Sequence, residues 1–416
     1  MSRARENDRN YAFWMGLVLC TIYQSYRYPL QINTVGFSPT YSDTPLVWQA
    51  GKFVLALPLI AISVIQWLSN SARVTRWPIV LGTLFLSSYS LLKIFGGGDP
   101  QYLDVFFWML FALGLVLAVD TVSISAIDRF FCLLLAYAFG STLIEVVLFV
   151  GFGRLPAMAY DGTYMVRFGG FLDDPNGFAA ILFLLMGWSS ERFKGRTRFL
   201  ILAGIVVSLL LTQSWTAIAF FLAMLLVYSV IALSKHPLLA TLTICAFSLL
   251  LIFFAVHGIP QLPVGLFTDI LDTKQGSIEG HQFPWAHWSS AWADWALLGD
   301  WKYNAYESWW PAAMVNFGLL WFGVYLSLVT ALLAYLQRSC SKAPREAKPV
   351  YVGLRLFGYF FAFGSLGLPF PIKFPINALF FLFFFLAAFG KIGASKYAIA
   401  PSHDLLSAEV STEGQQ

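Results

Sequence analysis

Long apolar runs recur along almost the whole chain of 416 residues, and this feature limits the fold more than any other. Hydrophobic residues make up 58% of the sequence and charged residues only 12%, whereas about 25% charged residues is usual in soluble domains. A helix that crosses a bilayer needs roughly 20 mostly apolar residues. The sequence therefore predicts an all-α integral membrane protein with about 12 transmembrane helices, which leaves little chain for a soluble domain.

The predicted helices form one polytopic membrane domain over residues 11–395. The polar segments 1–10 and 396–416 are predicted to be cytoplasmic tails, the second of them disordered. Segments 153–176 and 257–310 are predicted to be periplasmic loops, and the latter, near the C-terminal third, is the only long one. The helix windows are 11–27, 47–69, 77–94, 102–119, 130–152, 176–190, 199–213, 215–234, 238–256, 311–336, 349–368 and 377–395.

The basic residues determine the predicted orientation. With the N-terminus inside, cytoplasmic segments hold 17 of the 26 Lys and Arg residues and outer segments hold 7. Because loops rich in Lys and Arg stay in the cytoplasm, both termini are predicted to be cytoplasmic. The same distribution explains the net charge of +4 without nucleic-acid binding. Lys52 and Lys93 lie near predicted helix ends, where lysines can snorkel to the headgroups.

The segment FLDDPNGFAA at 171–180 predicts the start of a helix at the outer face. Asp174 is a capping residue, and Pro175 suits a first helical turn. Arg167 lies seven residues before Asp174, and a guanidinium beside a helix N-terminus is suited to a phosphate or diphosphate. A helix start alone would explain the same residues. Asp173 and Asp174 together are a weak signal for a divalent cation, and no metal site is predicted.

The long loop 257–310 is dense in aromatic residues. Tryptophan prefers the headgroup level of a bilayer, and the spacing of Trp285, Trp288, Trp292 and Trp295 fits one face of an amphipathic helix. A carbohydrate platform is the other interpretation, because the flat faces of sugars pack on aromatic rings. A lipid-linked sugar would satisfy both. The candidate sugar-binding residues are Trp285, Trp288, Trp309 and His281.

Glu307 lies just before the apolar run that begins at Pro311. At the mouth of a transmembrane helix, partial burial would raise the pKa of this carboxyl and suit it to general-base catalysis. A glutamate near a helix start also stabilises the helix dipole without any catalytic role. Composition alone gives the two interpretations equal weight.

Three stretches of the chain resemble the O-antigen ligase and O-antigen polymerase (Wzy-type) family of membrane glycosyltransferases. In this family an Arg precedes a helix near a Pro-Asn pair, a Thr-x-Ser segment follows, and a large periplasmic loop ends in a polar pair before a glycine. Glu307 and Ser308 match the pair, and Gly318 matches the glycine. Ligases typically have His at the position of Glu307. The stretches are RFGGFLDDPNGFAA at 167–180, LLLTQSW at 209–215 and LLGDWKYNAYESWWPAAMVNFGLLWFGVYL at 297–326.

The resemblance implies a GT-C-like enzyme of the bacterial inner membrane with its active site facing the periplasm. Its implied activity is transfer of a glycan from an undecaprenyl-diphosphate carrier to a sugar hydroxyl of another lipid-linked repeat unit, which polymerises an exopolysaccharide or O-antigen. Glu307 is then the candidate catalytic base, and no cofactor is implied. The bilayer and the lipid-linked oligosaccharide are expected partners, with a chain-length regulator and a flippase as candidates. The candidate diphosphate-binding residues are Arg167, Asn176, Lys302 and Arg154.

Three alternatives stay open. Ligation of a glycan to lipid A core is the second family activity. A lipid-linked sugar flippase or another carrier is an alternative from a different class of protein. The charged residues Lys52, Glu145 and Arg355 inside predicted helices favour it. The two halves of the sequence look unlike each other, which disfavours it, because carriers tend to have two related halves. A membrane acyltransferase would use a histidine base, for which His281 and His287 are available.

Overall fold

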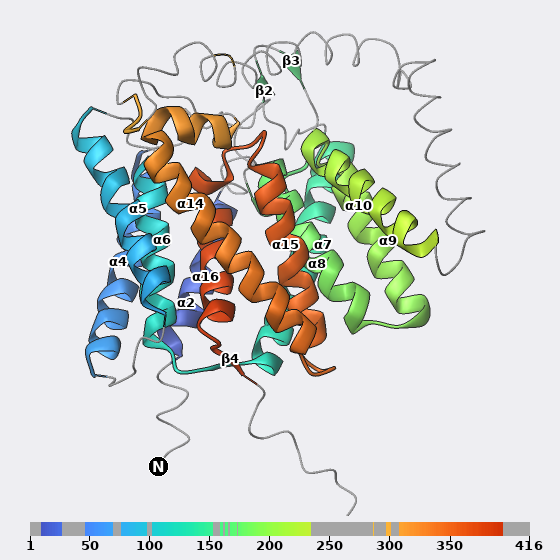
Figure 1. Ribbon diagram of the computed structural model, residues 1–416. Helices are drawn as coiled ribbons and strands as arrows, with labels where there is room; N and C mark the ends of the chain where they lie inside the picture. Colours follow the sequence, from blue (N-terminus) through green and yellow to red (C-terminus); the bar gives the residue numbers. More distant parts are fainter. Residues whose placement is uncertain are drawn as a thin grey trace, which may run out of the picture.

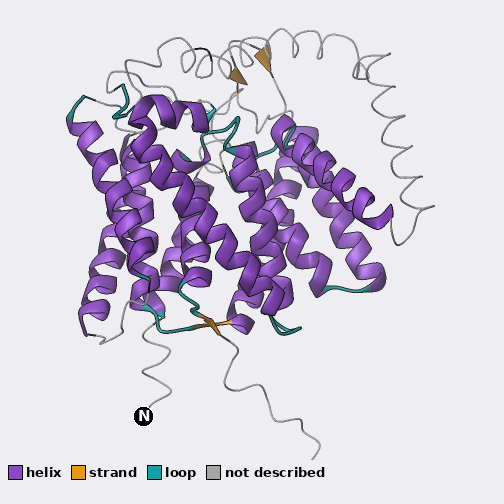
Figure 2. Ribbon diagram, viewed as in Figure 1, coloured by secondary structure: helices purple, strands orange, loops and turns teal. Residues whose placement is uncertain are grey.

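The structure is a computed structural model. It describes residues 10–26, 46–69, 76–97, 102–152, 159–160, 163–164, 167–172, 174–233, 286, 297–300 and 308–393. Helices dominate these residues (Figure 2). They are α2 (Tyr11–Ile22), α4 (Leu46–Ser69), α5 (Trp77–Phe95), α6 (Tyr102–Ala118), α7 (Ile124–Phe152), α8 (Pro175–Arg192), α9 (Gly195–Leu211), α10 (Trp215–Leu233), α14 (Trp309–Lys342), α15 (Lys348–Gly364) and α16 (Ile376–Ala388), with the 3₁₀ helices η1 (Tyr23–Tyr26) and η3 (Phe370–Ile372).

The strands of the described part form two short pairs. β1 (Val122–Ser123) pairs in parallel with β4 (Ile392–Gly393), and β2 (Ala159–Tyr160) pairs antiparallel with β3 (Thr163–Tyr164). The first pair ties the start of α7 to the chain after α16. Next to it, the ammonium of Lys391 donates hydrogen bonds to the carbonyls of Val116, Leu117 and Val119 at the end of α6. The described strands therefore connect segments next to helix ends, and they form no larger β-sheet.

Eleven α-helices of the described part coincide with eleven of the twelve predicted windows, and the window 238–256 lies outside the described residues. The largest differences are at helix ends. α7 begins at Ile124 instead of residue 130, and α16 ends at Ala388 instead of residue 395. Gly390 has a φ of +66° just after α16, a left-handed conformation that commonly terminates helices.

Four helices of the described part are long and apolar enough to cross a membrane, judged by length and composition. Three shorter helices are also apolar, at Tyr102–Ala118, Thr216–Tyr228 and Ile376–Ala388. This composition is that of an all-α membrane protein. The four candidate spans are Ala50–Leu68, Trp77–Phe95, Ile124–Gly151 and Trp309–Lys342.

The outer surfaces of several helices are strongly apolar. On α4, Ile65 is 67% exposed and Leu68 is 72% exposed, and on α7 Leu133 is 72% exposed and Val150 is 76% exposed. Contiguous apolar surface of this kind is unfavourable in water and indicates contact with lipid or another apolar partner. The exposed apolar faces and the lengths of the candidate spans therefore both indicate helices that lie in a membrane.

The helices pack in two groups joined along α14 and α15 (Figure 1). One group contains α2, α4, α5, α6 and α16, and the other contains α7, α8, α9 and α10. α8 packs closely along α15, where a Cβ added to Gly187 would lie 2.8 Å from the carbonyl oxygen of Val352. Small residues that let helix backbones approach closely are typical of packing between membrane helices.

The two ends of this bundle differ in which helices begin there. We call the end at which α8, α10, α14 and α16 begin the upper end, as it is drawn in Figure 1, and the opposite end the lower end. α14 is interrupted near the upper end, because Gly318 has a φ of +81° and a ψ of 171°. Residues 309–317, here called the first half of α14, therefore run in a different direction from the rest of that helix (Figure 1).

Candidate functional site

The upper end brings together polar side chains from two stretches that are distant in sequence. The guanidinium of Arg167 donates from Nε to the carbonyl of Thr212 at 3.1 Å and from Nη2 to Oδ1 of Asn176 at 3.1 Å. Ser214 Oγ donates to the same Oδ1 at 2.7 Å. We call Arg167, Asn176, Thr212 and Ser214 the Arg167 cluster. Two hydrogen bonds from one guanidinium fix its plane, so its orientation is set before any ligand binds.

Local sequence explains how α8 supplies Asn176 to the cluster. Asp174 is the N-cap of α8, and its side chain accepts a hydrogen bond from the backbone N–H of Asn176 at 2.9 Å. Pro175 occupies the first turn, where its missing N–H costs nothing. The predicted start of this helix at Asp174 and Pro175 is thus confirmed. Asn176 consequently lies in the first turn, beside Arg167.

The turn between α9 and α10 supplies the other two members. α9 ends at Leu211 and α10 begins at Trp215, which confirms the short connection between the predicted windows 199–213 and 215–234. Gln213 has a φ of +48°, a value uncommon for residues other than glycine. Thr212 Oγ1 accepts from the N–H of Ser214 at 3.2 Å, and Ser214 Oγ accepts from the N–H of Ala217 at 3.3 Å. The Thr-x-Ser spacing therefore folds the turn and caps α10.

Glu145 of α7 supports the segment after Arg167. Its carboxylate is 3% exposed and accepts a hydrogen bond from the N–H of Gly170 at 2.8 Å. Gly170 has a φ of +57°, and the ring of Phe178 fills the space that a side chain would need. The sequence placed Glu145 inside a predicted helix, where it counted only in favour of a carrier. In the structure, it binds the backbone of this segment.

One turn, at residues 364–368, lies between the first half of α14 and the Arg167 cluster. The N–H of Trp310 donates to the carbonyl of Ser365 at 3.2 Å, in a turn at residues 364–368 that follows α15. A Cβ added to Gly367 in this turn would lie 3.9 Å from Oγ1 of Thr216. Thr216 follows Ser214 by two residues, so the starts of α14 and α10 border the same 364–368 turn.

Several predicted site residues lie outside the described residues. They are Glu307, Lys302, Arg154, Trp285, Trp288 and His281. Ser308, the residue after Glu307, is described: it is 1% exposed and has a φ of +55°. Of the predicted diphosphate-binding residues, the structure brings Arg167 and Asn176 into contact.

Trp309 does not meet the expectation of a sugar platform. It is fully buried at the start of α14, with its ring edge-on or tilted against Phe317, Trp321 and Tyr325 at 6.1 to 6.2 Å between centroids. A sugar stacks on an exposed ring face, and the ring of Trp309 exposes none. The physical reason is the break at Gly318, which folds the first half of α14 back onto its second half.

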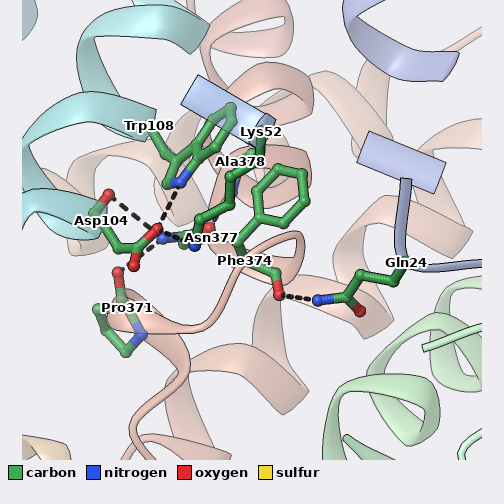
Figure 3. A network of polar contacts seen from close by, with 8 residues as sticks. All are labelled: Gln24, Lys52, Asp104, Trp108, Pro371, Phe374, Asn377 and Ala378. Carbon is green, nitrogen blue, oxygen red and sulfur yellow. Dashed lines mark hydrogen bonds and ion pairs between the residues drawn. The ribbon is translucent and has the colours of Figure 1, made fainter. Parts of the chain in front are cut away.

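A second polar group at the upper end holds a buried ion pair (Figure 3). Lys52 Nζ lies 2.7 Å from Oδ1 of Asp104, which also accepts from Trp108 Nε1 at 2.7 Å. Asn377 Nδ2 donates to the carbonyl of Pro371 at 3.0 Å and lies 3.5 Å from the carbonyl of Asp104. The expectation that Lys52 snorkels is wrong, because Asp104 provides a partner inside the bundle. Sequence reasoning missed Asp104, whose only signal is a carboxylate in an apolar helix.

Lys93 forms a third polar group at this end. Its ammonium is fully buried and donates to the carbonyls of Asp300 at 2.9 Å and Asn316 at 2.7 Å. The snorkelling expectation is therefore wrong here as well: the side chain points into the protein, where backbone carbonyls receive it. These carbonyls belong to the third stretch that carries the family resemblance.

Among the residues that the structure describes, no three His, Cys, Asp or Glu side chains are grouped so that they could hold a metal ion. Asp174 serves as a helix cap, and Asp173 lies outside the described residues. A fixed guanidinium beside a helix N-terminus suits a phosphate group, so the chemistry that the Arg167 cluster offers is recognition of an anion.

In comparisons with known proteins, the chain matches no family model, and no curated protein matches its sequence.

Proposed function

We propose that this chain is a Wzy-type polysaccharide polymerase of the bacterial inner membrane, with twelve spans, both termini in the cytoplasm and the upper end facing the periplasm. It would transfer a glycan from an undecaprenyl-diphosphate carrier to a hydroxyl of another lipid-linked repeat unit. The observation that carries the proposal is the Arg167 cluster: two separate stretches, 167–180 and 209–215, meet there through hydrogen bonds.

The third stretch supports the same proposal. Its described residues border the 364–368 turn through Trp310, and this turn adjoins the start of α10. All three stretches are therefore gathered at one end of the bundle, although more than 100 residues separate the first from the last. An enzyme that acts on a lipid-linked diphosphate needs its anion site near the membrane surface, where the headgroup lies.

In the proposed reaction, the anomeric carbon of the donor glycan leaves the diphosphate oxygen and forms a bond to the acceptor hydroxyl oxygen. The bonding electrons depart with undecaprenyl diphosphate, whose charge is met by Arg167 and the α8 N-terminus. Glu307, as general base, takes the proton of the acceptor hydroxyl. The energy of transfer comes from the lipid-linked donor, so no nucleotide is required.

The experiment supplies purified protein in lipid nanodiscs with a lipid-diphosphate oligosaccharide and no nucleotide, and separates the products by length. We expect a ladder of extended glycans. Arg167→Ala should lower the rate by about 10²- to 10³-fold, the usual loss for a transition-state donor. Glu307→Gln should lower it by about 10²- to 10⁴-fold.

Two matched controls use the lower end. Arg192→Ala and Glu191→Gln each remove a charge from an ion pair of the lower end, with Asp128 and Lys348 respectively, and both should retain wild-type ladders. Full activity in both Arg167→Ala and Glu307→Gln would overturn the site assignment. A single transfer to lipid A core would identify a ligase, and movement of the lipid-linked sugar without a new bond would identify a carrier.

A further inference from the structure

Lys93 occupies an unusual position for a charged residue in an apolar helix. It lies two residues before the end of α5 and is fully buried. The rings of Tyr102 and Phe317 flank its ammonium at 5.3 and 5.4 Å from their centroids. A buried ammonium is costly unless hydrogen bonds and nearby π-faces compensate it. The compensation here comes from the first half of α14, through the carbonyl of Asn316 and the ring of Phe317, and from the carbonyl of Asp300 and the ring of Tyr102 on α6.

The break in α14 explains what Lys93 binds. In a continuous helix, the N–H of Leu320 would donate to the carbonyl of Asn316. Instead, the N–H of Leu320 donates to the carbonyl of Leu297 at 3.4 Å, and the carbonyl of Asn316 accepts from Lys93 Nζ at 2.7 Å. The carbonyl of Val315 likewise accepts from the N–H of Asp300 at 2.7 Å. Lys93 and the segment 297–300 thus replace hydrogen-bond partners that the break removes.

The contact between segment 297–300 and α14 is backbone against backbone. Gly299 has a φ of +80° and Gly318 a φ of +81°, values that favour glycine. A Cβ added to Gly299 would lie 2.6 Å from the N of Gly318, so neither position has room for a side chain. Tyr89 adds a further tie from α5, because its hydroxyl donates to the carbonyl of Leu298 at 2.7 Å.

The other end of the first half of α14 is tied near the Arg167 cluster. Ser308 precedes this helix and is buried, and the N–H of Trp310 is bound to Ser365 in the 364–368 turn. The first half of α14 is therefore bound at its end by Lys93, through Asn316, and at its start by the 364–368 turn, which adjoins the Arg167 cluster. Because this segment is short and bound at both ends, we expect a change at Lys93 to displace Ser308.

We propose that Lys93 is a positioning residue, which holds the first half of α14 in register with the Arg167 cluster and so sets the rate of glycan transfer. The inference rests on the proposed function, and it adds a residue to which the family resemblance assigns no role. Lys93 acts through the backbone carbonyls of Asp300 and Asn316 and touches no substrate. A residue with this role should affect the turnover number more than the binding of the donor.

The test compares Lys93→Met with a matched control, the double variant Lys52→Met with Asp104→Leu. The control removes another buried lysine of the described residues together with its partner. Lys93→Met should lower kcat by about 100-fold, the loss that a displacement of about 1 Å can cause, while KM for the lipid-linked donor stays within about twofold of wild type. The control should keep kcat within about threefold, since the expected cost of replacing an ion pair by apolar residues is small.

Hydrogen exchange gives a readout that does not depend on activity. In Lys93→Met, the amides of Asp300, Trp310 and Leu320 should exchange faster than in wild type, and in the control they should not change. Tyr89→Phe, a milder variant that leaves the buried charge in place, should show the same change in exchange at Asp300 with a kcat lowered by about threefold, the effect of one neutral hydrogen bond.

Wild-type kcat in Lys93→Met, or unchanged exchange at the three amides, overturns the proposal. A rise in KM for the donor with unchanged kcat also overturns it, because that pattern belongs to a binding residue. If wild-type protein itself transfers no glycan, the proposed function fails, and with it the catalytic part of this inference. Faster exchange in Lys93→Met would then still support its structural part, the attachment of the first half of α14 to α5.

Discussion

The ion pairs at the two ends of the helix bundle differ in how deeply they are buried. At the lower end, Arg192 lies 3.1 Å from Asp128 and Lys348 lies 3.2 Å from Glu191, with 47% and 51% of the two basic side chains exposed. At the upper end, Lys52 and Asp104 pair at 2.7 Å with 9% and 12% of their side chains exposed. Arg167 and Lys93 are buried there as well.

The difference indicates that the upper end has its buried charged residues for a reason other than stability. An exposed ion pair contributes little, about 0 to 1 kcal/mol, and costs little to keep. A buried charge costs several kcal/mol in desolvation, and an apolar replacement of the whole pair is often as stable. Among the described residues of the upper end, Arg167 and Lys93 are buried and bound by carbonyl and amide oxygens, and this favours a role in recognition or catalysis at that end, in agreement with the proposed function.

The largest effect on stability is expected for Asp104→Leu, which removes the partner of Lys52 and leaves a buried ammonium (Figure 3). The free energy of unfolding should fall by about 3 to 5 kcal/mol, measured by denaturant titration in micelles. The double variant with Lys52→Met should recover to within about 1 kcal/mol of wild type, since no charge is left unpaired. Equal stability of Asp104→Leu and wild type would show that the pair is not buried in the folded protein.

Gly318→Ala is expected to have the next largest effect. Its φ of +81° and the contact with the carbonyl of Leu297 leave no space for a methyl group, so the free energy of unfolding should fall by about 2 to 3 kcal/mol. Gly323→Ala in the same helix is the matched control, because a Cβ there meets no atom within 4 Å. That variant should be neutral or slightly stabilising. Equal effects of the two substitutions would contradict the break in α14.

The sequence predicted the lengths and positions of most helices because the apolar runs are long and their ends carry local signals. Asp174 and Pro175 mark the start of α8, and the close spacing around Gln213 marks the turn before α10. Arg167 was also correctly placed beside a helix N-terminus, because it lies only seven residues from Asp174. Signals that act within a few residues can be interpreted without knowledge of the tertiary packing.

The partners of the buried charges could not be predicted, because they lie far away in the sequence. Lys52 meets Asp104, and Lys93 meets carbonyls more than 200 residues away. The break at Gly318 is also invisible in hydropathy, since the surrounding run VNFGLLWFGVYL is mostly apolar on both sides. The assignment of Trp309 to the sugar platform was wrong because of this break. The density of aromatic residues in the sequence does not reveal which rings are buried when the first half of α14 packs against the second.

Ser214→Ala tests how far the Arg167 cluster depends on its hydroxyl. The variant loses one hydrogen bond to Asn176 and the cap of α10, so the free energy of unfolding should fall by about 1 kcal/mol. Glycan transfer should also slow, since Asn176 loses a partner next to Arg167. Ser341→Ala near the end of α14 is the control, because its hydroxyl bonds only the preceding turn at an exposed position. Wild-type stability and activity in Ser214→Ala would remove this hydroxyl from the site.

The smallest effect is expected at the lower end, from Arg192→Ala. The variant should lose at most about 1 kcal/mol of stability, and Asp128 keeps a hydrogen bond from Trp188 Nε1 at 2.8 Å. The loss should shrink when the ionic strength rises from about 0.1 to 1 M, because the Debye length falls from about 10 to 3 Å. The cost of Asp104→Leu should be nearly insensitive to the same change, since salt does not enter the interior. If unfolding titrations gave both variants the same cost and the same salt dependence, the contrast between the two ends would be wrong, and with it the argument that buried charge marks the functional end.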